Sequence, residues 1–283
     1  MRHEFEIQTS HNDFECEAYC CSAFLIEVHV VQDLNVVLII GSAPDAVKAK
    51  DWDLSGFSSC VAINNAWQIT EEWDYLIYPE DLPRERLPPI ASLAHRQLVD
   101  AHDFVPQQNR FGGFVYAGGT MAFTAGYWAL GALKPDVIAF LGCDMVYSAK
   151  AGESSHFYGQ GSPDPLRSDI TLQSLEAKSV RFMALAQLQH CAVVNLSELP
   201  DSRLLFPRVS ISAFPLQQPR DELLSLYAGG LDAKAVNKAL MAEKALDYMV
   251  PSGRYWEVIH QFDPLKLCDI DAMWLEAADH SMA

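Results

Sequence analysis

Two polar residues that could carry acid–base chemistry follow one short apolar run. The run VIAFL at residues 137–141 is too short to span a membrane and is typical of a buried central strand in a parallel sheet. Gly142 then turns the chain, Asp144 follows, and a polar loop carries His156. Because ligands of open α/β sheets bind beyond the carboxyl ends of the strands, we expect Asp144 and His156 to lie in a site.

The loop after this run offers several groups for transfer chemistry. His156 lies in the polar segment SSHFYG, where a histidine can serve as general acid or base near neutral pH. The hydroxyls of Tyr147 and Tyr158 could bond to a leaving phosphate, although Tyr158 could equally pack over the loop. Asp144 could bind a hydroxyl, hold a loop amide or ligate Mg²⁺, and the lack of an obvious carboxylate partner disfavours the metal.

Two glycine-containing turns could bind phosphate. Gly118, Gly119 and Thr120 open an apolar segment, where glycines permit close backbone approach, the threonine can cap a helix and the helix end favours an anion. The turn that begins with Gly41 and Ser42 follows another apolar run, but it is neither GxGxxG nor a P-loop. An ordinary turn is the alternative at both positions.

Further strands are expected at residues 36–40, 60–63, 75–78 and 192–194, with helical patterns at 90–100, 121–133 and 168–189. This alternation predicts an α/β fold, a Rossmann-like doubly wound and mainly parallel sheet with helices on both faces. The carboxyl ends of parallel strands share one edge. Polar residues that follow the apolar runs should therefore meet there: Ser42, Asn64, Asn65, Asp81, Asp144 and Asn195.

The pattern predicts three parts in the chain. Residues 1–34 show no clean period and are interpreted as an N-terminal extension, and residues 35–212 as the Rossmann-like nucleotide-binding or catalytic domain. Residues 213–283 are interpreted as an acidic, helical C-terminal tail or subdomain. This tail could cover the edge of the sheet, form a lid or bind a partner.

Composition disfavours some function classes. The chain has 283 residues, of which half are hydrophobic, and its 20 Lys and Arg against 37 Asp and Glu give a net charge of −17. An acidic surface repels phosphate backbones and anionic lipid, so nucleic acid is not an expected partner. Seven scattered cysteines without a CxxC pair, no evident signal peptide and no transmembrane segment predict a cytoplasmic location. The oligomeric state, including a homo-oligomer, is left open.

The order of these motifs resembles a superfamily that joins bacterial Rossmann-type sialyltransferases to a group named after archaeal 6-hydroxymethylpterin diphosphokinases. The matching stretches lie between residues 36 and 197 and are IIGSAPDAV, AINNAW, GGTMAF, LGCDMVY and SHFYG. Two departures are visible: Ser42 and Ala43 stand where the family has Asn-Gly, and Asp45 replaces its serine. In a gapless alignment of the SHFYG loop, the place of the family's base histidine falls nearer Gln160 than His156.

The resemblance implies a glycosyltransferase-like enzyme, metal-independent and without a cofactor, that uses a nucleotide-sugar donor such as a CMP-sugar and a glycan or small acceptor. It implies donor binding by Asn64, Gly119, Thr120 and Tyr147, with the base near His156. We assign catalysis to His156, Tyr147 and Asp144. The expected substrate-binding residues are Gly41, Ser42, Asn64, Asn65, Asp81, Gly118, Gly119, Thr120 and Tyr158.

Two alternatives remain beside this expectation. The diphosphokinase group would require ATP and Mg²⁺, and Asp144 would then belong to the metal or phosphate site. A non-catalytic nucleotide- or glycan-binding protein on the same fold is the other alternative, and the altered turn at residues 42–45 favours it.

Overall fold

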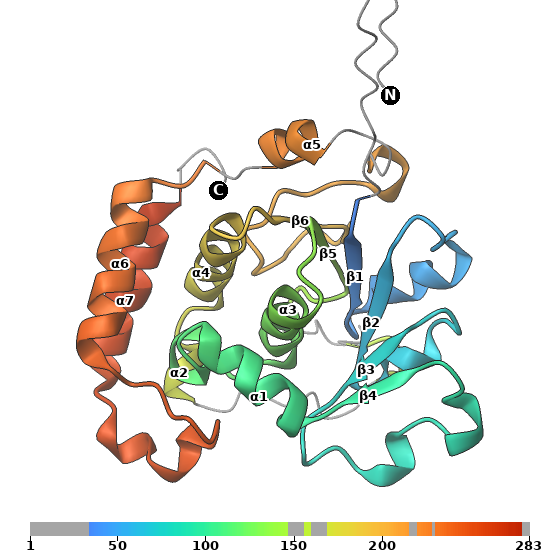
Figure 1. The fold of residues 1–283 in the computed structure, drawn as a ribbon, viewed down its shortest axis with the longest axis horizontal. Helices are drawn as coiled ribbons and strands as arrows, with labels where there is room; N and C mark the ends of the chain where they lie inside the picture. Colours follow the sequence, from blue (N-terminus) through green and yellow to red (C-terminus); the bar gives the residue numbers. More distant parts are fainter. Residues whose placement is uncertain (1–33, 147–155, 160–168, 215–219, 228–229, 279–283) are drawn as a thin grey trace, which may run out of the picture. The chain divides into compact units, whose positions relative to one another are not determined.

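In the computed structural model, the described residues are 34–146, 156–159, 169–214, 220–227 and 230–278. All of them belong to one compact unit, residues 32–283. The centre of this unit is a six-stranded sheet in which every pair of neighbouring strands is parallel. The predicted α/β class with a Rossmann-like parallel sheet is confirmed (Figure 1).

The strand order of the sheet is β4-β3-β2-β1-β5-β6. The strands are β1 (Val36–Ile40), β2 (Ser59–Ile63), β3 (Tyr75–Ile77), β4 (Gln97–Val99), β5 (Val137–Leu141) and β6 (Ala192–Asn195). The two longest buried strands, β1 and β5, pair in the middle with Val36 opposite Val137. Both are buried on both faces, which explains why their sequences are unbroken apolar runs.

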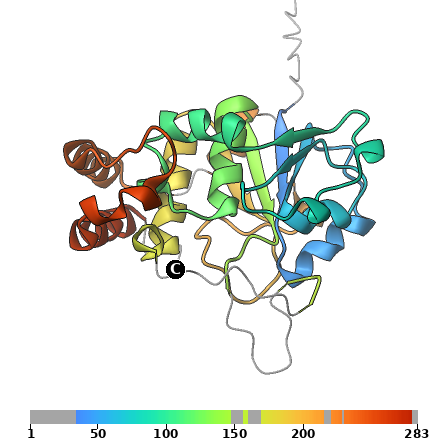
Figure 2. The same ribbon diagram turned by 90° about the horizontal axis from the view of Figure 1, so that it is seen from below.

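Alternate residues of the strands enter two hydrophobic clusters, one on each face of the sheet. The α-helices α1 (Ala101–Arg110), α2 (Phe114–Ala117), α3 (Met121–Ala132) and α4 (Leu175–Gln187) contribute to one cluster. The opposite cluster includes the 3₁₀ helices η1 (Pro44–Asp51) and η2 (Asn64–Gln68) and α5 (Arg220–Leu226). Figures 1 and 2 show α3 and η1 on opposite sides of the strands.

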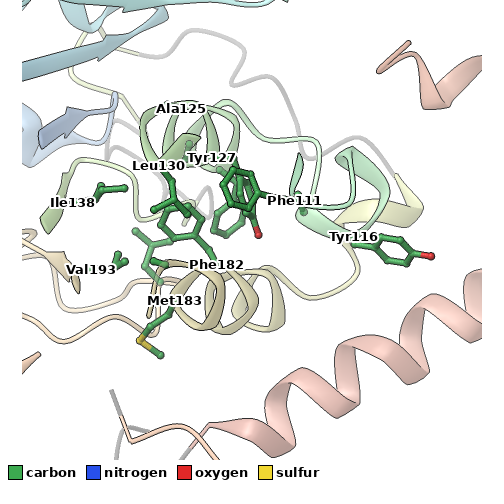
Figure 3. Packing of buried hydrophobic residues seen from close by; sticks show 14 of the residues in the cluster. Phe111, Tyr116, Ala125, Tyr127, Leu130, Ile138, Phe182, Met183 and Val193 are labelled. Atoms are coloured by element: carbon green, nitrogen blue, oxygen red, sulfur yellow. The ribbon is translucent and has the colours of Figure 1, made fainter. Parts of the chain in front are cut away.

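The packing of α3 against α4 is aromatic. Tyr127 of α3 meets Phe182 of α4 edge to face, with ring centroids 4.9 Å apart and an interplanar angle of 87° (Figure 3). Phe182 also contacts Phe140 of β5, so the same ring connects both helices to the sheet. Helix α3 is buried nearly all round, as its apolar sequence predicts.

The C-terminal helices α6 (Ala233–Leu246) and α7 (Pro264–Ala277) lie side by side, and α7 packs on α4 (Figure 1). Asp232 caps the start of α6 and Asp263 caps the start of α7. Between them run the short 3₁₀ helices η7 (Tyr255–Glu257) and η8 (Ile259–Gln261). Leu267, Ile270 and Trp274 of α7 are buried in the same hydrophobic cluster as α3 and α4.

The prediction of a helix at residues 90–100 is wrong. This stretch contains the one-turn 3₁₀ helix η4 (Ile90–Ser92) and then the strand β4, which pairs with β3. Ile90 is 88% exposed, whereas Leu93 and Leu98 pack against one hydrophobic cluster and Val99 is buried in the other, so the apolar residues of this stretch do not form one helical face. A three-residue edge strand is too short for its alternation to be recognised in the sequence. A further 3₁₀ turn, η3 (Arg84–Arg86), precedes η4.

The long helix expected at residues 168–189 is shorter than predicted. Ser168 lies outside the described residues, and Asp169 caps the 3₁₀ helix η5 (Ile170–Leu172). Helix α4 begins only after Ser174, whose hydroxyl accepts a hydrogen bond from the backbone N–H of Ala177. A 3₁₀ helix η6 (Ile211–Ala213) follows β6. No described helix is both long and apolar enough to cross a membrane.

Candidate functional site

The strand order changes direction at β1, with β2 on one side and β5 on the other. In doubly wound sheets this is the place where the connections diverge to opposite faces and leave room for a ligand beyond the carboxyl ends. The carboxyl end of β1 leads into Gly41 and Ser42, and that of β5 leads into Gly142 and Asp144. The predicted residues Gly41, Ser42 and Asp144 therefore lie at this edge.

The turns after β1 and β5 are fastened to each other. The N–H of Gly41 donates to the carbonyl of Leu141 at 2.8 Å, and the N–H of Ala43 donates to the carbonyl of Gly142 at 2.9 Å. A Cβ atom on Gly41 would lie 2.3 Å from the carbonyl oxygen of Gly142 and 2.7 Å from Sγ of Cys143. Gly41 is thus required by the close approach of the two turns.

A hydrogen-bonded network joins the turns after β1, β5 and β6. The side chain of Asn195, which is fully buried, donates to Asp144 Oδ1 at 3.3 Å and to Ser202 Oγ at 3.1 Å. Its own Oδ1 accepts from the N–H of Ser197, whose hydroxyl donates to Asp45 Oδ2 at 2.9 Å. The backbone N–H of Glu198 also donates to Asp45 Oδ2.

Each of the two carboxyl groups keeps one oxygen outside this network. Asp45 is 7% exposed and Asp144 is 1% exposed. Neither Asp45 Oδ1 nor Asp144 Oδ2 has a hydrogen-bond partner in the part of the chain that the structure describes. Burial, followed by the negative charge of Asp144, raises the pKa of Asp45 despite the bond from Ser197.

The turn that carries His156 lies against the turn after β1. The N–H of Phe157 donates to the carbonyl of Ser42 at 3.0 Å, and His156 pairs with Gly159 in a short antiparallel bridge. His156 is 5% exposed, and burial lowers its pKa. Tyr158 is 41% exposed, with its ring 5.0 Å from that of His156. Tyr147 and Gln160 lie outside the described residues.

Residues Gly118, Gly119 and Thr120 form the start of α3 at the carboxyl edge. Thr120 caps the helix by accepting from the N–H of Phe123, as the sequence predicts. The N–H of Gly119 is bonded to Oγ1 of Thr171 at 3.2 Å, so a protein hydroxyl already occupies this donor. A Cβ on Gly119 would come within 2.3 Å of the hydroxyl oxygen of Tyr255.

The sequence prediction missed the groups that cover the start of α3. Tyr255, in η7, donates a hydrogen bond to Asp169 Oδ2 at 2.6 Å, and Asp169 Oδ1 accepts from the N–H of Thr171. Tyr255 is 135 positions from Thr120 in the chain, and no local pattern in the tail indicates the contact. The adjacent Arg254 reaches Glu80, in the loop after β3, at 3.2 Å.

The remaining predicted residues follow β2 and β3. Asn64 has a left-handed backbone with φ of 52°, which an asparagine tolerates, and its Oδ1 is buried with no hydrogen-bond partner among the described residues. Asn65 is 8% exposed and lies in η2. Asp81 is exposed in the loop after β3.

The arginines near the strand ends are held by protein groups. Arg203 forms a bidentate pair with Glu176 at 2.9 and 3.2 Å, and Arg208 donates to the carbonyls of Leu199 and Pro200. Within the described ranges, no group of three or more His, Cys, Asp and Glu side chains is arranged to hold a metal ion.

The structure brings the predicted residues to one edge in separate groups. Asp144 is joined to Asn195, the His156 turn is joined to Ser42, and Gly119 is joined to the segment that carries Thr171. Comparison with family models, with curated proteins and with solved structures found no match to this chain.

Proposed function

We propose that this protein is a glycosyltransferase-like enzyme that binds a nucleotide-sugar donor at the carboxyl edge of its sheet. The observation that carries the nucleotide part is the change of strand direction at β1, where the turns after β1 and β5 and the start of α3 occupy one edge. The motif resemblance supports a sugar carried by a nucleotide, with a CMP-sugar as the first candidate.

In this proposal the donor's nucleotide lies near Asn64 and the start of α3. The unpartnered Oδ1 of Asn64 would accept a hydrogen bond from a base or ribose group. The first turn of α3 would stabilise the phosphate, since a helix start favours an anion. The phosphate would compete with the hydroxyl of Thr171 for the N–H of Gly119.

The transfer step would use His156 as general base. His156 accepts the proton of the acceptor hydroxyl, the acceptor oxygen forms a bond to the anomeric carbon, and the bond from that carbon to the phosphate oxygen breaks. The nucleotide leaves with the electron pair of that bond. A pKa lowered by burial keeps the imidazole neutral near pH 7, the form that accepts a proton.

A thermal-shift series tests the nucleotide part. CMP, CDP, UDP, GDP and ATP are each added with and without Mg²⁺; a ligand at a hundred times its dissociation constant adds about 2.7 kcal/mol of stability. We expect stabilisation by a sugar-carrier nucleotide without metal. No shift with any nucleotide would contradict the proposal.

A pair of variants tests whether the nucleotide of the donor binds near Asn64. Asn64→Gly removes the amide and keeps a residue suited to a φ of 52°, whereas His190→Gly makes the same exchange at a φ of 57° after α4. We expect Asn64→Gly to weaken nucleotide binding at least fivefold and His190→Gly to leave it unchanged. Full transfer by an intact His156→Ala variant would exclude His156 as the base.

Two alternatives have observations in their favour. The amides of Gly41 and Ala43 already donate to the carbonyls of Leu141, the last residue of β5, and Gly142, which favours a binding protein without transfer activity. The carboxyl pair of Asp45 and Asp144 favours the ATP- and Mg²⁺-dependent diphosphokinase, because Mg²⁺ needs only one or two carboxylates beside substrate phosphates. ATP stabilisation that requires Mg²⁺ would select the kinase.

A further inference from the structure

A series of hydrogen bonds joins the start of α3 to the C-terminal part of the chain. The N–H of Gly119 donates to Oγ1 of Thr171 at 3.2 Å, and the N–H of Thr171 donates to Oδ1 of Asp169 at 2.8 Å. The hydroxyl of Tyr255, in η7, donates to the other carboxylate oxygen of Asp169 at 2.6 Å. Tyr255 therefore holds Asp169, which in turn holds the segment whose hydroxyl occupies the N–H of Gly119.

Tyr255 also fills the space beside Gly119. A Cβ atom on Gly119 would lie 2.3 Å from the hydroxyl oxygen of Tyr255 and 3.3 Å from its Cζ. A protein hydroxyl thus uses the close approach that a glycine permits. Gly119 itself is exposed, whereas Tyr255 is 7% exposed and Thr171 is fully buried. A ligand can reach Gly119 from solvent, but the N–H that would bind it is already engaged.

The two helices on either side of η7 in the chain are firmly anchored to α4. The ammonium group of Lys178 donates to Asp271 of α7 at 2.5 Å, and both side chains are buried. Arg181 binds Glu243 of α6 through two hydrogen bonds, at 2.7 and 2.8 Å. Breaking either buried pair would be costly. A movement at the start of α3 is therefore expected in the connecting segment, residues 247–262, and not in α6 or α7.

The ion pairs that hold η7 on its outer side are weak. Arg254 pairs with Glu80 at 3.2 Å and with Glu257 at 3.6 Å, and all three side chains are about half exposed. Exposed pairs of this kind contribute little to stability. The bond from Tyr255 to the carboxylate of Asp169 belongs to the stronger, charge-assisted class. That bond is therefore the contact whose loss should release η7.

We propose that η7 is a latch on the start of α3. While Tyr255 is bound to Asp169, Thr171 stays on the N–H of Gly119, and an anionic group of a ligand binds there only after Tyr255 has left. This inference rests on the proposed binding of a nucleotide at this edge and adds the step that controls its entry. Release frees the N–H of Gly119 for a phosphate oxygen, which the positive end of α3 attracts.

The latch lowers the affinity for the ligand by a factor that can be changed. A protein whose binding-competent state is only partly populated binds with an affinity reduced by that fraction. Tyr255→Phe keeps the ring, which stacks on Phe114, and removes the hydroxyl that holds Asp169. A hydrogen bond to a charged group corresponds to roughly a 10- to 150-fold change in an equilibrium constant. The variant should therefore populate the open state more and bind the ligand more tightly.

Calorimetric titration of the full chain with CMP, without metal, measures this effect. We expect Tyr255→Phe to bind CMP about 10-fold or more tightly than the parent. The matched control is Tyr248→Phe, which also removes a tyrosine hydroxyl from residues 247–262. That hydroxyl accepts from the N–H of Asp263 at the start of α7 and is not part of the latch. The control should bind CMP as the parent does.

Amide hydrogen exchange tests the latch without any ligand. The N–H groups of Gly119 and Thr171 exchange only when their hydrogen bonds open. Both should exchange faster in Tyr255→Phe than in the parent, while the amides of the central strand β5 stay protected. In Tyr248→Phe the exchange of Gly119 and Thr171 should match that of the parent.

The outcomes separate the latch from the proposed function. Binding of CMP by Tyr255→Phe that is equal to or weaker than that of the parent would overturn the latch alone. Weaker binding would mean that the hydroxyl contacts the ligand instead of excluding it. Unchanged exchange at Gly119 would also overturn the latch, whatever the protein binds. If neither protein binds CMP, CDP, UDP, GDP or ATP, the proposed function and the latch fail together.

Discussion

Arg181 of α4 and Glu243 of α6 form a bidentate ion pair inside the protein. Its N–O distances are 2.7 and 2.8 Å, and the side chains are 1% and 6% exposed. The hydroxyl of Tyr127 accepts from the guanidinium at 2.6 Å, and the indole N–H of Trp274 donates to Glu243 Oε1 at 2.7 Å. The pair therefore connects α3, α4, α6 and α7.

Replacing Glu243 with glutamine should destabilise the protein strongly. The change leaves Arg181 charged and buried without its counterion, which costs about 3–5 kcal/mol of unfolding free energy. Urea denaturation measures this loss. The control is Glu276→Gln, which breaks an exposed pair with Lys238 and should cost less than about 1 kcal/mol. Equal effects at both positions would contradict the role given to the buried pair.

Gly41→Ala tests the close contact between the turns after β1 and β5. The new Cβ would press on the backbone carbonyl of Gly142, which cannot rotate away, so we expect a loss of about 1–3 kcal/mol. Gly131→Ala is the matched control. The atom nearest to its new Cβ is Oε1 at the end of the Gln107 side chain, which can move, and a helix interior favours alanine over glycine by about 1 kcal/mol. An unchanged denaturation midpoint in Gly41→Ala would mean that the turns can separate freely.

The sheet could be predicted because its central strands are buried on both faces. The strands β1 and β5 are apolar throughout, and β2 is apolar after Ser59; each is followed at once by a turn with polar residues. The parallel arrangement then places Ser42, Asn64 and Asp144 at one edge. The short strand β4 could not be predicted, since three residues at the edge of a sheet show no reliable period.

The contacts within the site could not be derived from the sequence. The link from Asp45 to Ser197 joins positions 152 residues apart, and that from Tyr255 to Asp169 joins positions 86 apart. Asp45 is visible in the sequence as a departure from the motif of the superfamily that the chain resembles, but nothing in the sequence indicates that Ser197 and Glu198 donate to its carboxyl group. Such pairs depend on the packing of loops, for which the sequence has no periodic signal.

Tyr255→Phe tests the link between the C-terminal segment and the start of α3. The change removes a 2.6 Å hydrogen bond to the carboxylate of Asp169 and keeps the ring, which packs against Phe114. Loss of a hydrogen bond to a charged group costs about 1.5–3 kcal/mol, measurable by urea denaturation. Tyr158→Phe, at an exposed ring, should cost nearly nothing. A Tyr255→Phe variant as stable as the parent would show that the bond is not maintained.

The pKa of His156 can be measured directly by NMR titration of the imidazole protons, with a His156→Gln variant to identify the resonance. Because burial disfavours the imidazolium, we expect the inflection below the ordinary value of 6.5. In the unfolded chain the same histidine protonates more readily, so its contribution to stability is present above about pH 6.5 and is lost as the pH falls. If His156 is the base of the proposed transfer, the acidic limb of the rate profile should follow the same pKa. An inflection at or above 6.5 would mean that the imidazole is exposed or paired with an acid in solution.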